Sequence, residues 1–107
     1  MVYLVMADGD RPTHDLEAIK AAFSNATSLN VTGTALRNAF ALGYGRQEIV
    51  DVIQTIKPGH FYKTMPSEKN PGLMQDVYRV PDGDLELYVK FTSDVVTEFK
   101  LLSFKEK

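Results

Sequence analysis

The stretch Leu85-Glu86-Leu87-Tyr88-Val89-Lys90-Phe91 decides the fold, because its apolar and polar residues alternate at every position. This period of two is typical of a β-strand with one buried face, and it places Tyr88 and Lys90 together on the opposite face. The preceding Pro81-Asp82-Gly83-Asp84 is typical of a turn. Residues 73–80 are therefore expected to form a hairpin with this strand.

A final strand is expected over residues 95–104, after a second turn at Thr92-Ser93-Asp94. Its apolar residues do not identify the buried face, because Leu101 and Phe104 have opposite parity. Either face of this strand is left open as the one that joins the core.

Two helices are expected in the first part of the chain, where apolar residues recur three or four positions apart. The first is expected to have Thr13 as its N-cap and to end near Ser24-Asn25. The second follows Thr32, another residue with a capping oxygen, and stops at Gly43.

A third helix has the clearest amphipathic pattern. It opens at Gly45 and ends before the helix-breaking Pro58-Gly59. Its apolar residues fall at positions i, i+3, i+4 and i+7: Ile49, Val52, Ile53 and Ile56. Helices followed by a strand meander predict an α+β fold, with the helices packed on one face of an antiparallel sheet.

The length of 107 residues predicts one domain, over residues 11–107, preceded by an N-terminal extension over residues 1–10. The absence of cysteine favours a reducing compartment, so the protein is expected to be cytoplasmic. The apolar stretch at residues 2–6 is too short for a signal segment and is followed by Asp8 and Asp10. Neither export nor a membrane span is expected.

The net charge of −2 argues against a protein that coats nucleic acid non-specifically. The charges are unevenly distributed, because eight of the twelve basic residues lie after Ile56. This distribution is compatible with a local basic cleft and equally with an ordinary solvated surface.

Lys63, Gln75, Tyr88 and Lys105 are of the residue types that can cleave RNA without a metal ion. Such cleavage requires deprotonation of a 2′-hydroxyl, stabilisation of the phosphorane and protonation of the leaving oxygen. If Lys63 and Lys105 meet across the sheet, each is expected to lower the pKa of the other. Two distant histidines and no cysteine make a metal site improbable.

The same residues have simpler interpretations. Lysines near turns are usually solvated charges, and a tyrosine on the polar face of a strand is more often a cross-strand packing partner. His14 is expected at the start of a helix, and His60 is a weaker candidate for substrate contact. Spacing alone therefore leaves nuclease chemistry and a plain polar surface both open.

The sequence resembles the MqsR family of toxins, which are messenger-RNA interferases of bacterial type II toxin–antitoxin modules. The resemblance runs from about Arg11 to the last residue in ordered blocks. These blocks are Arg11-Pro12-Thr13-His14, Ala35-Leu36 with Leu42-Gly43, Phe61-Tyr62-Lys63-Thr64-Met65, Gln75-Asp76-Val77-Tyr78-Arg79, Tyr88-Val89-Lys90 and Ser103-Phe104-Lys105-Glu106-Lys107.

This resemblance implies a RelE-like microbial ribonuclease fold. It also implies sequence-specific cleavage of single-stranded mRNA through 2′-hydroxyl attack, with no cofactor, and hence inhibition of translation and growth. The catalytic residues that it implies are Lys63, Gln75, Tyr88 and Lys105. Three further positions are implied to bind substrate: Tyr62, Met65 and Arg79.

The resemblance further implies a partner, a cognate MqsA-like antitoxin that binds DNA and is encoded in the same operon. A rival hypothesis is a non-catalytic module of the same fold that binds RNA or only a protein, because an exposed edge strand is a ready docking site. Growth arrest on overexpression distinguishes the toxin from the binding module.

Overall fold

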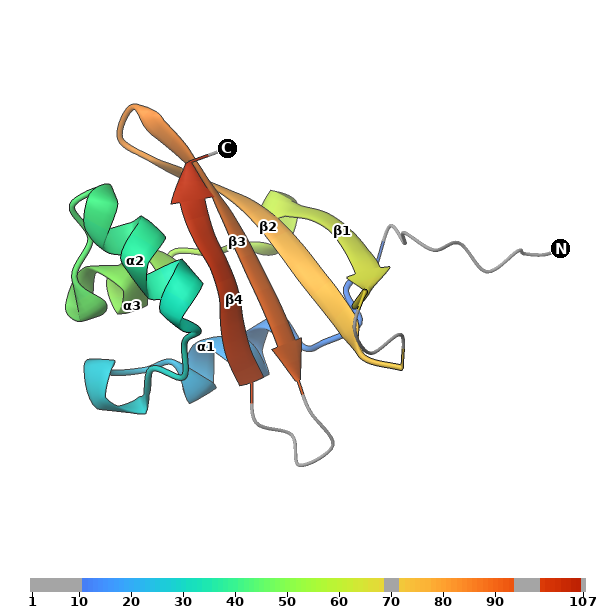
Figure 1. The fold of residues 1–107 in the computed structure, drawn as a ribbon. Coiled ribbons are helices and arrows are strands. Elements are labelled where there is room, and N and C mark those ends of the chain that lie inside the picture. Colours follow the sequence, from blue (N-terminus) through green and yellow to red (C-terminus); the bar gives the residue numbers. More distant parts are fainter. Residues whose placement is uncertain (1–10, 69–71, 94–98, 107) are drawn as a thin grey trace, which may run out of the picture.

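The computed structural model describes residues 11–68, 72–93 and 99–106. Within them, three α-helices precede a four-stranded antiparallel sheet of order β1-β2-β3-β4 (Figure 1). The helices are α1 (Leu16–Ala22), α2 (Gly33–Ala41) and α3 (Arg46–Gln54), with short 3₁₀ turns at Ala26–Ser28 and Pro58–His60. The strands are β1 (Phe61–Pro66), β2 (Met74–Asp82), β3 (Leu85–Ser93) and β4 (Phe99–Glu106). The predicted α+β fold with helices on an antiparallel sheet is confirmed, and it is consistent with a RelE-like ribonuclease fold.

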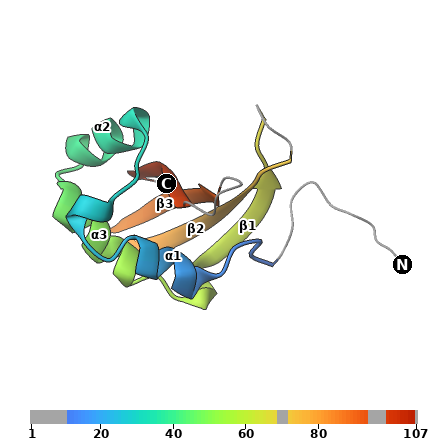
Figure 2. The ribbon, with the colours of Figure 1, turned by 90° about the horizontal axis from the view of Figure 1, so that it is seen from below.

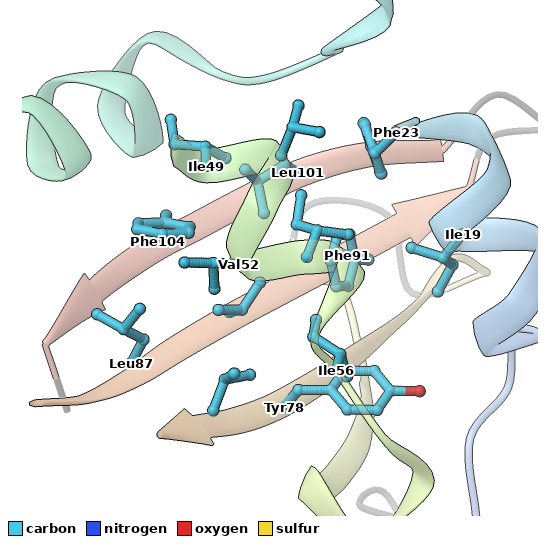
Figure 3. Packing of buried hydrophobic residues seen from close by; sticks show 14 of the residues in the cluster. Ile19, Phe23, Ile49, Val52, Ile56, Tyr78, Leu87, Phe91, Leu101 and Phe104 are labelled. Carbon is cyan, nitrogen blue, oxygen red and sulfur yellow. The ribbon is translucent and has the colours of Figure 1, made fainter. Parts of the chain in front are cut away.

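The helices lie along one face of the sheet, with α2 next to the β4 edge (Figure 2). Apolar side chains from α1, α3 and the strands fill the space between the two layers (Figure 3). The largest of these that are fully buried include Phe23, Ile49, Tyr78, Phe91 and Phe104. The alternating pattern of β3 is obeyed, because Leu87, Val89 and Phe91 all point into this core.

The first helix begins two residues later than predicted. Its N-cap is Asp15, whose carboxylate accepts a hydrogen bond from the backbone N–H of Glu17 at 3.2 Å. The prediction of Thr13 as the cap was wrong because Thr13 is bound elsewhere. Its N–H donates to the buried carboxylate of Asp76 at 3.0 Å, and its hydroxyl lies 2.7 Å from that of Thr64.

The other two helix starts are confirmed. The Thr32 hydroxyl accepts from the N–H of Ala35 at 3.2 Å, which caps α2. Gly43 follows the end of α2 with a positive φ of 92°, a conformation that favours glycine. Gly45 is the N-cap of α3, and its N–H donates to the Glu48 carboxylate at 3.0 Å.

The hairpin between β2 and β3 is tighter than predicted. Pro81 and Asp82 still pair with β3, so only Gly83 and Asp84 remain in the turn, and Gly83 has a positive φ of 59°. Strand β1 was not assigned from the sequence, because its residues do not alternate between apolar and polar. The predicted extension over residues 1–10 and residues 95–98 of the predicted last strand lie outside the described residues.

A β-bulge in β4 explains why its periodicity was ambiguous. Lys90 pairs with Ser103, whereas the next residue of β3, Phe91, pairs with Leu101, so Leu102 is an extra residue. The extra residue changes the parity of the strand. Leu101 and Phe104 therefore both reach the core, although they stand on opposite faces by simple alternation.

In the part of the chain that the structure describes, no helix is long and apolar enough to cross a membrane.

Candidate active site

The sheet face that the helices do not cover, here called the open face, is polar. It collects the alternate residues of all four strands because the core takes the others. Register and burial assign to it Tyr62, Lys63 and Met65 of β1, Gln75, Val77 and Arg79 of β2, Glu86, Tyr88 and Lys90 of β3, and Ser103 and Lys105 of β4.

The central row of the open face crosses all four strands. Lys63 pairs with Val77, Val77 with Lys90, and Lys90 with Ser103. Val77 has no exposed surface although it lies on the open face. Long side chains on both sides can cover it with their aliphatic stems, which brings the charged ends of the two lysines over the middle of the sheet.

The next row consists of Arg79, Tyr88 and Lys105, paired in that order across β2, β3 and β4. The Nζ atom of Lys105 lies 5.4 Å from the centre of the Tyr88 ring, and that of Lys90 lies 5.9 Å from it. Both distances are within the range of a cation–π interaction. The phenol of Tyr88 is thus accompanied by two ammonium groups.

A second β-bulge places Tyr62 on the open face beside Lys63. Phe61 pairs with Tyr78 and Lys63 with Val77, so Tyr62 is the extra residue. Tyr62 is 47% exposed, and the guanidinium carbon of Arg79 lies 5.0 Å, and the Nζ of Lys63 5.6 Å, from the centre of its ring. An exposed aromatic ring held between cations is suited to stacking on an unpaired base.

Two pockets open on this side of the sheet. The first, of about 300 Å³, is lined by Met65, Ser67, Glu68, Gln75 and Lys90. The second, of about 380 Å³, is lined by Gly59, His60, Phe61, Tyr62, Arg79, Pro81 and Glu86. Lys63, Tyr88 and Lys105 line neither pocket but belong to the rows between them.

Arg79 is fixed at the second pocket by its neighbours. Its guanidinium forms a 3.2 Å ion pair with Glu86 and lies over the ring of Tyr62. Its Nε atom is buried and has no hydrogen-bond partner among the described residues. A buried donor without a partner is costly to the folded state.

Lys90 is a lysine of the open face whose pKa is lowered. Burial lowers the pKa of Lys90, and the ammonium groups of Lys105 and Lys63 lower it further, whereas Glu68 opposes the shift. Lys63 and Lys105 thus both act on Lys90. Lys90 was not among the candidate residues, although its parity with Tyr88 already placed it on the same face.

All seven residues singled out from the sequence lie on the open face: Tyr62, Lys63, Met65, Gln75, Arg79, Tyr88 and Lys105. His60 lines the second pocket, and its Nδ1 accepts a hydrogen bond from the N–H of Lys57 at 3.0 Å. His14 has a structural contact instead, since its Nε2 lies 3.0 Å from the carbonyl oxygen of Met74.

The donors and acceptors gathered here suit a phosphodiester substrate. Amines, an amide and a phenol can bind phosphate oxygens and transfer protons, and the exposed ring can stack on bases. Among the described residues, no group of three or more His, Asp or Glu side chains is arranged to hold a metal ion.

Comparison with known proteins gives two matches. Residues 11–106 match the family described as "Motility quorum-sensing regulator, toxin of MqsA". The chain is also similar to the mRNA interferase toxin MqsR of Escherichia coli (strain K12), with 35% identity over 83 residues, which cover 78% of this chain and 83% of that protein.

Proposed function

The chain belongs to the MqsR family of toxins, and we propose that it is an mRNA interferase that cleaves single-stranded mRNA without a metal ion. The observation that carries the proposal is the open face itself. Lys63, Gln75, Tyr88 and Lys105 come from four different strands, yet their side chains share one face of the sheet.

The proposed reaction uses the nucleophile that RNA supplies. The 2′-oxygen loses its proton and attacks the adjacent phosphorus, and the bond from phosphorus to the 5′-oxygen breaks as that oxygen takes up a proton. The products are a 2′,3′-cyclic phosphate and a 5′-hydroxyl. We assign proton transfer to Lys63 and Lys105, phosphate stabilisation to Gln75 and the lysines, and orientation or proton transfer to Tyr88.

Three neighbouring residues are proposed to bind the bases on either side of the cut. Tyr62 offers a ring for stacking, and Arg79 lines the second pocket with a guanidinium group that can bind a base. Met65 lines the first pocket, where its flexible thioether can adapt to a base. The two pockets would then receive nucleotides from the two sides of the scissile phosphate.

The family description names a toxin of MqsA, so an antitoxin partner follows from membership. We propose that the partner of this chain is an MqsA-like protein that is encoded in the same operon and binds DNA. Co-expression of the adjacent gene is expected to relieve growth arrest by the toxin. Arrest that persists beside the expressed neighbour would contradict this partner.

The experiment that tests the activity is cleavage of a defined RNA in excess chelator, with the ends of every product mapped. Wild type is expected to cut at restricted sequences and to leave cyclic-phosphate ends. Lys63→Ala and Lys105→Ala are each expected to lower the rate by roughly two or more orders of magnitude, the scale of one acid–base or charge-stabilising group. Loss of cleavage in chelator would indicate a metal nuclease instead.

Overexpression distinguishes the toxin from the rival binding module. Wild type is expected to arrest growth, and Lys63→Ala, expressed to the same level, is expected not to. If folded wild type cleaves no RNA and both proteins arrest growth equally, sequestration by a non-catalytic module becomes the better account.

A further inference from the structure

Lys90 lies at the centre of the open face, and the reaction proposed above gives it no role. It lies in the middle of β3, paired with Val77 on one side and Ser103 on the other. It is half-buried and lines the first pocket together with Gln75. A substrate phosphate that reaches Gln75 and the neighbouring lysines would therefore also meet the Lys90 amine.

The charges that face Lys90 come from every neighbouring element except β2, whose residue opposite it is Val77. Lys63 faces it from β1 and Lys105 from β4, and both disfavour its protonated form. Glu68, which follows β1, favours that form. On β3 itself, the Tyr88 ring lies 5.9 Å from the Lys90 Nζ. Burial has the largest effect on the pKa of Lys90. It favours the neutral amine, as the two neighbouring ammonium groups also do.

A half-buried lysine whose neutral form is favoured by burial and by two neighbouring lysines matches one of the tasks that RNA cleavage requires. The general base must be unprotonated when the reaction starts, whereas the group that protonates the leaving oxygen must carry a proton. A half-buried lysine flanked by two other lysines is suited to the first task. More exposed ammonium groups, such as that of Lys105, are suited to the second.

We propose that Lys90 is a fifth catalytic residue and acts as the general base that takes the proton of the 2′-hydroxyl. This inference rests on the proposed ribonuclease function and deepens it. The Lys90 amine gains the proton as the bond between the 2′-oxygen and phosphorus forms. Lys63 and Lys105 keep the phosphate-binding and acid roles, and one of them donates a proton to the departing 5′-oxygen. Exchange with water then restores both protonation states.

The first test asks whether Lys90 must lose a proton or need only supply a positive charge. Lys90→Arg keeps a positive charge but cannot lose its proton near neutral pH, whereas Lys90→Ala removes the charge and the amine. Lys57, which is exposed, provides the matched control Lys57→Arg. The readouts are kcat over a range of pH on one defined RNA, and affinity for the same RNA with a 2′-deoxy residue at the cut.

Lys90→Arg is expected to lower kcat by about 100-fold to 10,000-fold, the usual contribution of one proton-transfer group, and to change RNA affinity only a few-fold. The rise of the wild-type rate with pH, which reports the neutral base, is expected to disappear in this variant. Lys57→Arg is expected to match wild type. Full activity of Lys90→Arg would overturn the proposal, because a charged group would then suffice.

Chemical rescue is the second test, and it does not depend on how arginine fits the site. Adding a small primary amine such as ethylamine to Lys90→Ala is expected to restore cleavage in proportion to the free-base concentration. Rescue in proportion to the ammonium form, or full activity of Lys90→Ala without amine, would overturn the base role. If wild type itself cleaves no RNA, the proposed function fails, and this inference fails with it. Failure confined to the Lys90 variants leaves the proposed function standing.

Discussion

At the residue scale, the ring of Tyr78 contributes packing to the core, whereas its buried hydroxyl is expected to lower the free energy of unfolding. Its ring packs edge-on against Phe61 and Phe91, at centroid distances of 5.6 and 6.1 Å. Its hydroxyl is buried and has no hydrogen-bond partner within the described ranges of the chain. Tyr78→Phe keeps the ring and removes the unpaired group. It is expected to leave the free energy of unfolding unchanged or to raise it by about 1–2 kcal/mol in urea denaturation at neutral pH.

The same hydroxyl predicts how stability changes at alkaline pH. Burial, with smaller contributions from Asp76 and Asp15, raises the pKa of Tyr78 from 10.0 to about 12. The folded state therefore retains a proton that the unfolded state loses between these pH values, and the free energy of unfolding falls across that window. Hydrogen bonding to Asp82 raises the pKa of Tyr44 to about 12 as well, so Tyr44 adds to the loss.

Urea denaturation at several pH values between 10 and 12 checks this expectation. The decline of stability with pH is expected to be shallower in Tyr78→Phe than in wild type, because one of the two tyrosines no longer contributes. Identical slopes in the two proteins would show that Tyr78 does not titrate with the raised pKa.

Most functional candidates on the open face were predictable from the sequence, but Lys90 was not identified as one of them. Alternation along β3 shows that Lys90 shares a face with Tyr88, and that much was predictable. Its pairing with Val77 and Ser103, and the approach of Lys63 and Lys105, depend on the register of three other strands. Register is not readable from a single strand, so the residue remained an ordinary surface lysine until the sheet was assembled.

At the element scale, two β-bulges account for what periodicity could not predict. The bulge at Tyr62 places this residue and Lys63 on the same face, although adjacent strand residues normally point to opposite faces. The bulge at Leu102 brings both Leu101 and Phe104 into the core. Regular elements such as α3 and β3 were predictable because each follows one period throughout. Strands that change parity midway have no such signature.

A buried carboxylate helps to hold the segment before α1 to the sheet, beside the contacts of Thr13 with Thr64 and of His14 with Met74. Asp76 has no exposed surface, and its two oxygens accept hydrogen bonds from the N–H groups of Thr13 and His14 at 3.0 and 2.8 Å. Asp76→Asn replaces one acceptor by a donor that faces an N–H. It is expected to lower the free energy of unfolding by about 1.5–3 kcal/mol, as for hydrogen bonds to charged groups.

Urea denaturation of Asp76→Asn beside Asp84→Asn measures this effect. Asp84 lies exposed in the β2–β3 turn, where the same substitution is expected to change stability by less than about 0.5 kcal/mol. Equal stability of the two variants would show that the buried carboxylate does not anchor the segment.

At the scale of the whole molecule, charge is divided between two sides. The open face carries Lys63, Arg79, Lys90 and Lys105 on a chain whose net charge is −2. On the helix side, a pocket beside α3 is lined by the acidic residues Glu48, Asp51 and Asp82. The open face holds four basic side chains against the acidic Glu86, and this local excess of positive charge favours the approach of RNA to that side.

This polarity predicts how RNA binding responds to salt. If Lys63, Arg79 and Lys105 each contact a phosphate, affinity for a single strand is expected to fall with salt at a log–log slope of about −2, since each contact contributes about −0.7. Titrations of an RNA blocked by a 2′-deoxy residue, at several salt concentrations, measure the slope. Lys105→Met is expected to make it shallower by about 0.7, whereas Lys57→Met, at an exposed residue outside the four strands, is expected to leave it unchanged. The two variants share the loss of one positive charge, so equal changes in slope would mean that net charge alone governs binding. A difference between them locates the phosphate contacts on the open face.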